Sequence, residues 1–126
     1  MERRGRKFTL SQIHTIQSRV EKWKDTDEMA LLVWLILYTK LKMRDLLGWF
    51  NNDPVLRCKF LQTHEMDDLM EYANAPRLLP KTHQAYLYQW KRVCNQWFGI
   101  QGATFEMLRR KPDGEIKTAT TIHTNN

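Results

Sequence analysis

The chain is poor in cysteine and in every residue pattern typical of a metal centre. Its 126 residues include only Cys58 and Cys94, and neither stands in a Cys-x-x-Cys spacing. A disulfide framework is therefore not expected, and a reduced, intracellular setting is the default. The four histidines are scattered, so we expect no metal and no cofactor. No glycine-rich loop that could cradle a phosphate occurs, and we expect no small-molecule substrate.

Long apolar runs are also missing. The longest, Met29 to Tyr38, has ten residues, whereas a membrane-spanning helix needs about 20. No apolar segment of the kind found in a signal peptide follows the basic N-terminus. We therefore expect no membrane partner. The expected location is the cytoplasm or nucleoid, or the nucleus if the source is a eukaryote or its virus.

Basic and aromatic residues, in contrast, are plentiful. Lysine and arginine number 20 against 14 acidic residues, which gives a net charge of +6 and a pI near 9.5. Such a balance suits a polyanionic partner. Hydrophobic residues make up 42% of the chain and include five tryptophans. A chain of this length buries roughly two-thirds of its surface on folding, so one packed domain is expected.

Apolar residues recur at helical spacing over most of the chain. A capping box at Thr9–Gln12 predicts a helix that ends near Trp23. The run from Met29 to Tyr38 is apolar all round, as in a central core helix. Further helices are predicted over 42–49, 63–72, 82–98 and 104–110, with 74–80 as a loop and 55–62 open between a strand and a helical turn. Cys94 falls on an apolar helix face and is expected to be buried. The sequence predicts a mainly α, single-domain bundle over 8–111, with little or no sheet, a basic arm over 1–7 and a turn and tail over 112–126.

Two segments carry a family resemblance. The first is Leu37-Tyr-Thr-Lys-Leu-Lys-Met-Arg-Asp-Leu46, and the second is Trp97-Phe-Gly-Ile100 followed by Glu106-Met-Leu-Arg-Arg110. The first resembles the Leu-Tyr-Thr-Gly-Leu-Arg-Ile-Ser-Glu-Leu box of the tyrosine recombinase (phage integrase) catalytic domain. The second resembles that family's His-x-Leu-Arg-Arg box. The resemblance implies part of a recombinase core, with a site built where the two boxes meet.

Departures from the family pattern remove the chemistry that the resemblance would otherwise imply. The family's first catalytic arginine falls on Lys42, and a lysine offers a point charge instead of a bidentate fork. Arg44 is expected to point elsewhere, because two residues along a helix is a rotation of about 200°. The family's histidine falls on Glu106, and only Arg109 matches a catalytic arginine. No tyrosine follows Tyr88 to serve as nucleophile. We therefore predict no strand cleavage and no enzyme activity.

The resulting hypothesis is a non-catalytic, double-stranded-DNA-binding protein, a regulator or accessory factor of a mobile element such as a phage or plasmid. A homodimer would supplement its grip. The candidate DNA contacts are Lys40, Lys42, Arg44, Lys91, Arg92, Arg109, Arg110, Lys111, Arg3, Arg4 and Arg6. Solvated helix ends and an ordinary basic terminus are the structural alternatives for these cations.

The alternative function is a helical protein-interaction module or a viral or plasmid accessory protein. Its expected interaction surface is an exposed aromatic pair, Trp49 and Phe50, beside the Asn-Asn-Asp-Pro break. The two hypotheses differ in geometry. DNA binding requires Lys42 and Arg109 on one concave surface, whereas the alternative scatters them over different faces.

Overall fold

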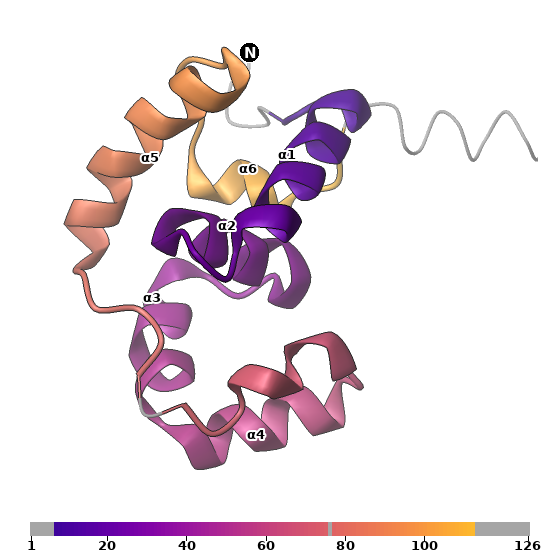
Figure 1. The fold of residues 1–126 in the computed structure, drawn as a ribbon, viewed down its shortest axis with the longest axis vertical. Coiled ribbons are helices and arrows are strands. Elements are labelled where there is room, and N and C mark those ends of the chain that lie inside the picture. The colour runs from indigo at the N-terminus through magenta and orange to yellow at the C-terminus, as the bar shows by residue number, and fades with distance from the viewer. Residues whose placement is uncertain (1–6, 76, 113–126) are drawn as a thin grey trace, which may run out of the picture.

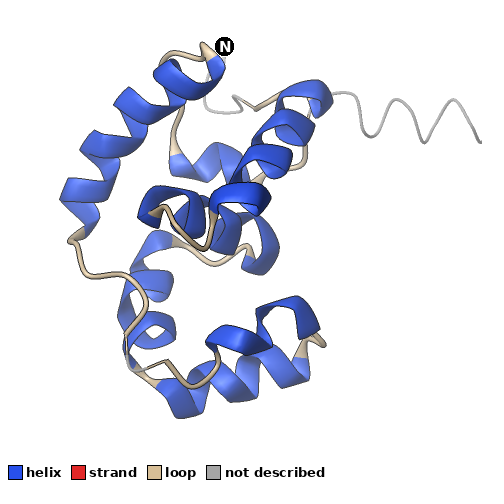
Figure 2. Cartoon of the chain, viewed as in Figure 1, coloured by secondary structure: helices blue, strands red, loops and turns tan. Residues whose placement is uncertain are grey.

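The structure is a computed structural model that describes residues 7–75 and 77–112. These residues are mainly helical and form no sheet, which confirms the predicted fold class at that level (Figure 2). In chain order the helices are α1 (Leu10–Trp23), α2 (Glu28–Thr39), α3 (Met43–Asp45), η2 (Leu46–Phe50), which is kinked at Gly48, α4 (Pro54–Thr63), the 3₁₀-helical η3 (Asp67–Tyr72), α5 (His83–Phe98) and α6 (Phe105–Arg109) (Figure 1). The predicted arm with Arg3, Arg4 and Arg6, and the predicted tail from residue 113 onward, lie outside the described residues.

The first two helices both begin at a capping residue, and α1 begins at the capping box that the sequence predicts. Gln12 donates its backbone N–H to Thr9 Oγ1 at 3.1 Å, and Thr9 donates its own to Gln12 Oε1 at 2.8 Å. The side chain of Asp27 caps α2 by accepting from the N–H groups of Met29 and Ala30. Residues 29–37 of α2 are all buried, and the helix packs against α1, α5 and α6. It is the central core helix that its composition predicts.

The segment between residues 54 and 72 corrects the prediction. Residues 55–62 belong to helix α4, which Asp53 caps by accepting from Leu56 N–H at 3.1 Å, with Pro54 at the first helical position. Thr63 ends this helix instead of opening the next one, and residues 67–72 form a 3₁₀-helix. The Asp-Pro pair therefore starts a helix in addition to ending the previous one.

Arg57 ties this segment together from the interior. Its side chain is fully buried. It donates hydrogen bonds of 2.6–3.1 Å to the backbone carbonyl oxygens of Phe50, Asn51, Tyr72, Ala73 and Ala75. Burial lowers the pKa of the guanidinium below its ordinary value, and the nearby Asp53 charge partly offsets this effect. One side chain thus satisfies carbonyls at the ends of both η2 and η3.

Helix α5 forms as predicted and positions one wall of the candidate site. Thr82 caps it by accepting from Ala85 N–H at 3.2 Å, and Gly99 ends it in the left-handed region, with φ of 68°. Its buried stripe includes Trp90 and Cys94, and burial raises the pKa of the Cys94 thiol to about 11. Phe105 of α6 stacks on Trp90 at 5.7 Å, so the chain after α5 returns to the core.

Candidate nucleic-acid interface

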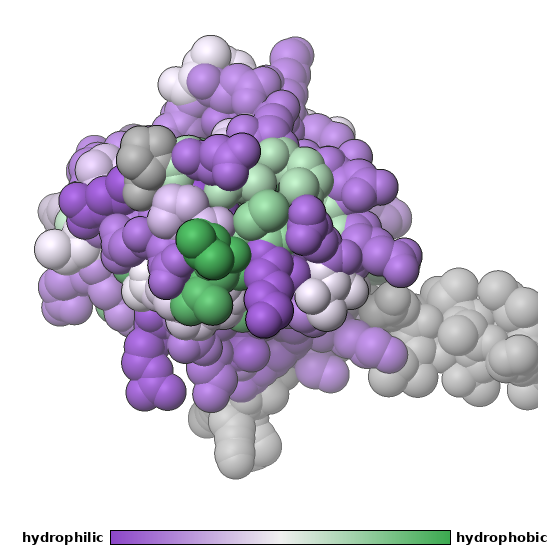
Figure 3. All heavy atoms as spheres, turned by 90° about the horizontal axis from the view of Figure 1, so that it is seen from below, coloured by the Kyte–Doolittle hydropathy of each residue, from purple (hydrophilic) through white to green (hydrophobic). Residues whose placement is uncertain are grey.

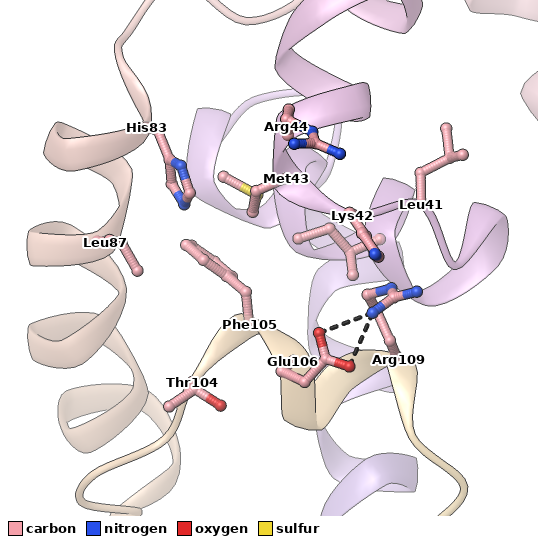
Figure 4. Close-up of a pocket in the computed structure, with 11 residues that line it drawn as sticks. Leu41, Lys42, Met43, Arg44, His83, Leu87, Thr104, Phe105, Glu106 and Arg109 are labelled. Carbon is pink, nitrogen blue, oxygen red and sulfur yellow. Dashed lines mark hydrogen bonds and ion pairs between the residues drawn. The ribbon is translucent and has the colours of Figure 1, made fainter.

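Four segments that are distant in sequence meet around one cavity of about 430 Å³. The end of α2, the start of α3, the start of α5 and helix α6 all contribute to its walls (Figure 4). Its basic side chains are Lys42, Arg44, Arg109 and His83, and we call this cavity the basic notch. In Figure 4 the three cations lie along one side of the cavity, while His83 and Leu87 lie across from them on α5.

The backbone between α2 and α3 places Lys42 and Arg44 together. Lys40 ends α2 in the left-handed region, with φ of 59°, and its N–H bonds to Ile36 O at 2.9 Å. Lys42 then adopts an extended conformation as the residue before α3. The rotation of about 200° between two helical residues therefore does not apply. The prediction that Arg44 points elsewhere is wrong, because both side chains line the cavity.

The second box reaches the notch through Arg109. Its Nε donates to the backbone oxygen of Lys40 at 2.8 Å, and Lys40 Nζ donates to the backbone oxygen of Leu108 at 3.2 Å. These two bonds join the end of α2, at Lys40, to the end of α6. Lys42 and Arg109 consequently line the same concave surface, as DNA binding requires.

A carboxylate moderates the positive charge of the notch. Arg109 Nη1 donates to both carboxylate oxygens of Glu106, at 2.7 and 2.8 Å, and Arg110 Nε lies 3.9 Å from the same group. The side chains of Arg109 and Glu106 are 22% and 48% exposed, so the pair contributes little to stability. It does fix the orientation of Arg109, and it offsets one of the cations that would face an anion.

The remaining predicted cations are dispersed. Lys91 lies one helical turn beyond Leu87 on α5. Leu87 lines both the notch and the neighbouring hollow that contains Lys91. Arg92 lies over the ring of Tyr88 at 5.9 Å, outside the residues that line the notch. Lys40 and Lys111 are exposed, and Arg110 is half-buried. The structure therefore gathers Lys42, Arg44 and Arg109, with Lys91 as a neighbour.

The predicted aromatic surface is partly wrong. Phe50 is buried, with 1% of its surface exposed, because Phe60 of α4 packs edge-on against it at 6.0 Å. Trp49 is half-buried and lines a hollow with Leu56, Lys59 and Phe60. In this region the exposed large hydrophobic residues are instead Val55 and Leu56, at the start of α4.

Other chemistries find little support in the part of the chain that the structure describes. No group of three or more His, Cys, Asp or Glu residues there could hold a metal ion. None of the described helices has the length and apolarity to cross a membrane. The sequence matches no protein-family model and no curated protein, and the fold matches no solved structure. The likeness to tyrosine recombinases thus stays a hypothesis that rests on the two boxes.

Proposed function

We propose that this chain is a non-catalytic DNA-binding protein that holds the phosphate backbone of a duplex at the basic notch. The observation that supports this proposal most directly is the convergence of Lys42 and Arg44 from one box with Arg109 from the other on a single cavity. A net charge of +6 adds a favourable long-range field.

The side chains of the notch suit a phosphate diester in complementary ways. Arg109 is held in place by Glu106 and Lys40, so it loses little conformational freedom on binding. Arg44 and Lys42 are exposed and can adjust to the anion. Arginine supplies bidentate geometry and lysine supplies a compact charge. Such contacts read backbone position and carry no base sequence.

The same site argues against strand cleavage. A recombinase of the resembled family attacks the phosphate with a tyrosine, and among the described residues no tyrosine lines the notch. Glu106 stands where the family has a histidine, and a carboxylate repels the developing negative charge of the transition state. A role as regulator or accessory factor of a mobile element follows from the resemblance to part of a recombinase core.

A salt titration tests the proposal. Fluorescence anisotropy with a labelled duplex should show binding at low salt that weakens as salt rises. About three phosphate contacts give a slope near −3 in a plot of log affinity against log salt. Absence of binding at low salt rejects the proposal. Intact duplex after incubation with Mg²⁺ is the expected result for the cleavage assay.

A second candidate function is protein interaction through the surface of α4. Val55 and Leu56 are 76% and 45% exposed, and Leu56 lines a hollow of about 300 Å³ together with Trp49, Lys59 and Phe60. Figure 3, which views the molecule from the end where α4 lies in Figure 1, shows apolar atoms gathered among polar ones. Sedimentation equilibrium tests the simplest occupant, a second copy. A dimer that Leu56→Asp dissociates favours this function, and a monomer at all concentrations excludes self-association.

A further inference from the structure

A second concave surface lies between α1 and the end of α5, away from the notch. It is a groove of about 520 Å³, which we call the aromatic groove, lined by His14, Thr15, Ser18, Arg19, Lys22, Trp23, Trp97 and Phe98. The notch lies at the start of α5, at His83, and Trp97 lies 14 residues further along that helix. At 1.5 Å per residue the two sites are about 20 Å apart along α5.

Cations and indole rings are interleaved in this groove. The guanidinium carbon of Arg19 lies over the Trp97 ring at 4.9 Å from its centroid and over the Trp23 ring at 5.6 Å. These contacts join α1 to α5 without an ion pair. Trp23 ends α1 and is 43% exposed, whereas Trp34 and Trp90 are buried. Part of the Trp23 indole is thus accessible beside the positive charge of Arg19.

The charge of the groove, unlike that of the notch, is not offset. No carboxylate lines it, and neither Arg19 nor Lys22 forms an ion pair with a residue in the described ranges. The Nε–H of Arg19 is buried without a hydrogen-bond acceptor among those residues. The side chains that α1 contributes are spaced by one, three and four residues, which places them on one helix face. A ligand with an anionic group would complement this charge.

We propose that the aromatic groove binds an unpaired nucleobase together with its phosphate, as a single-stranded nucleic acid presents them. The base stacks on the exposed part of the Trp23 indole, and Arg19 and Lys22 bind the phosphate. Alternating stacking surfaces and cations are how proteins hold single strands without reading sequence. A duplex keeps its bases stacked inside, so this site and the notch take different forms of nucleic acid. The proposal does not depend on the proposed function of the notch.

Anisotropy with a labelled short oligothymidylate tests the groove. Trp23→Ala should weaken binding by about fivefold or more, while Trp23→Phe retains most of the affinity. Tyr88→Ala is the matched control, since Tyr88 is a 68% exposed aromatic of α5 that does not line the groove. It should change the affinity by less than about twofold. An abasic strand of equal length should bind more weakly, and Trp23→Ala should leave its affinity unchanged.

Equal effects of Trp23→Ala and Tyr88→Ala, or equal binding of the abasic strand and oligothymidylate, overturn the proposal. If Trp23→Ala unfolds at a lower temperature than wild type, Lys22→Glu, at an exposed position, replaces it. Loss of oligothymidylate binding is then the expected result, and unchanged binding contradicts the proposal. Competition by thymidine monophosphate at strand-like concentrations overturns the assignment to single strands, and competition by the strand alone supports it. A double variant Lys42→Ala/Arg44→Ala separates the two proposals, because it should weaken duplex binding and leave the Trp23 effect intact.

Discussion

Arg109 and Lys40 form a reciprocal clasp between the two boxes: Arg109 Nε donates to the backbone oxygen of Lys40 at 2.8 Å, and Lys40 Nζ donates to the backbone oxygen of the residue before Arg109, at 3.2 Å. Lys40 takes the left-handed conformation that ends α2. That position holds glycine in the resembled family, and the backbone turns here although the side chain is a lysine. The clasp holds Arg109 on the same side of the notch as Lys42.

Glu106 should weaken the binding of anions at the notch. Glu106→Gln removes the carboxylate that neutralises Arg109 and lies near Arg110. We expect duplex affinity at low salt to rise by about threefold to tenfold, because an opposing charge within the Debye length is removed. Glu65→Gln is the control, since Glu65 is exposed and does not line the notch. A weaker affinity for Glu106→Gln than for wild type contradicts this role.

Within the segment from η2 to η3, Arg57 should be the position whose substitution destabilises the protein most. Arg57→Met leaves buried carbonyl oxygens at the ends of η2 and η3 without donors. We expect a loss of about 2–4 kcal/mol in the free energy of unfolding, measured in urea. Arg92→Met removes an exposed arginine that lies over Tyr88, and it should cost less than about 0.5 kcal/mol. Similar losses in both variants would show that the buried network has no special role.

The hydroxyl of Tyr86 should make stability fall at high pH. Burial, and then its hydrogen bond to Glu28, raise the pKa of Tyr86 well above its ordinary value, while the backbone N–H of Lys81 and the Arg77 charge oppose the shift. The folded state therefore holds this proton more tightly than the unfolded state. The resulting stabilisation is complete below about pH 10 and is lost as the pH rises further, when the unfolded chain ionises first.

Tyr86→Phe tests this linkage. At neutral pH the variant should be less stable by about 1 kcal/mol, because Glu28 loses a donor. The gap to wild type should narrow above about pH 10, since the variant has no hydroxyl to ionise. Tyr88→Phe, at an exposed position on the same helix, should show neither effect. A gap that stays constant from about pH 9 to about pH 11 is the contrary outcome.

Gly99 should be required for its conformation and not for space. A Cβ added there meets no atom within 4 Å, but the residue has φ of 68°. Gly99→Ala should therefore destabilise the protein by about 1 kcal/mol through the left-handed backbone alone. Gln96→Ala, at an exposed position in the last turn of α5, should change stability by less than about 0.5 kcal/mol. Thermal unfolding of both variants gives the comparison.

Local signals were sufficient for the helices whose caps lie next to them in sequence. Thr9, Thr82 and Gly99 act through neighbours within five residues, so a pattern of a few residues contains the whole interaction. The segment around Arg57 differs, because its stability comes from carbonyls up to 18 residues away. A charged residue in the sequence also gives no sign that it will be buried, and Phe50 was misplaced for the related reason that its cover, Phe60, comes from the next helix.

The notch could be predicted only in part. The two boxes indicated that Lys42 and Arg109 should share a surface, and they do. The inclusion of Arg44 depended on the extended backbone of Lys42, which no helical pattern reveals. The pairing of Glu106 with Arg109 follows from their spacing of three on α6. The aromatic groove joins α1 to the end of α5, and neither helix alone indicates it.

The most direct test of DNA binding at the notch compares two double variants that remove the same charge. Lys42→Ala/Arg44→Ala removes two cations of the notch, and Lys59→Ala/Arg77→Ala removes two exposed cations that line neither the notch nor the groove. In a salt series with labelled duplex, the first should lose at least about tenfold in affinity and about two units of salt slope. The second should lose less than about threefold. An equal loss in both would mean that net charge alone, and no built site, accounts for the binding.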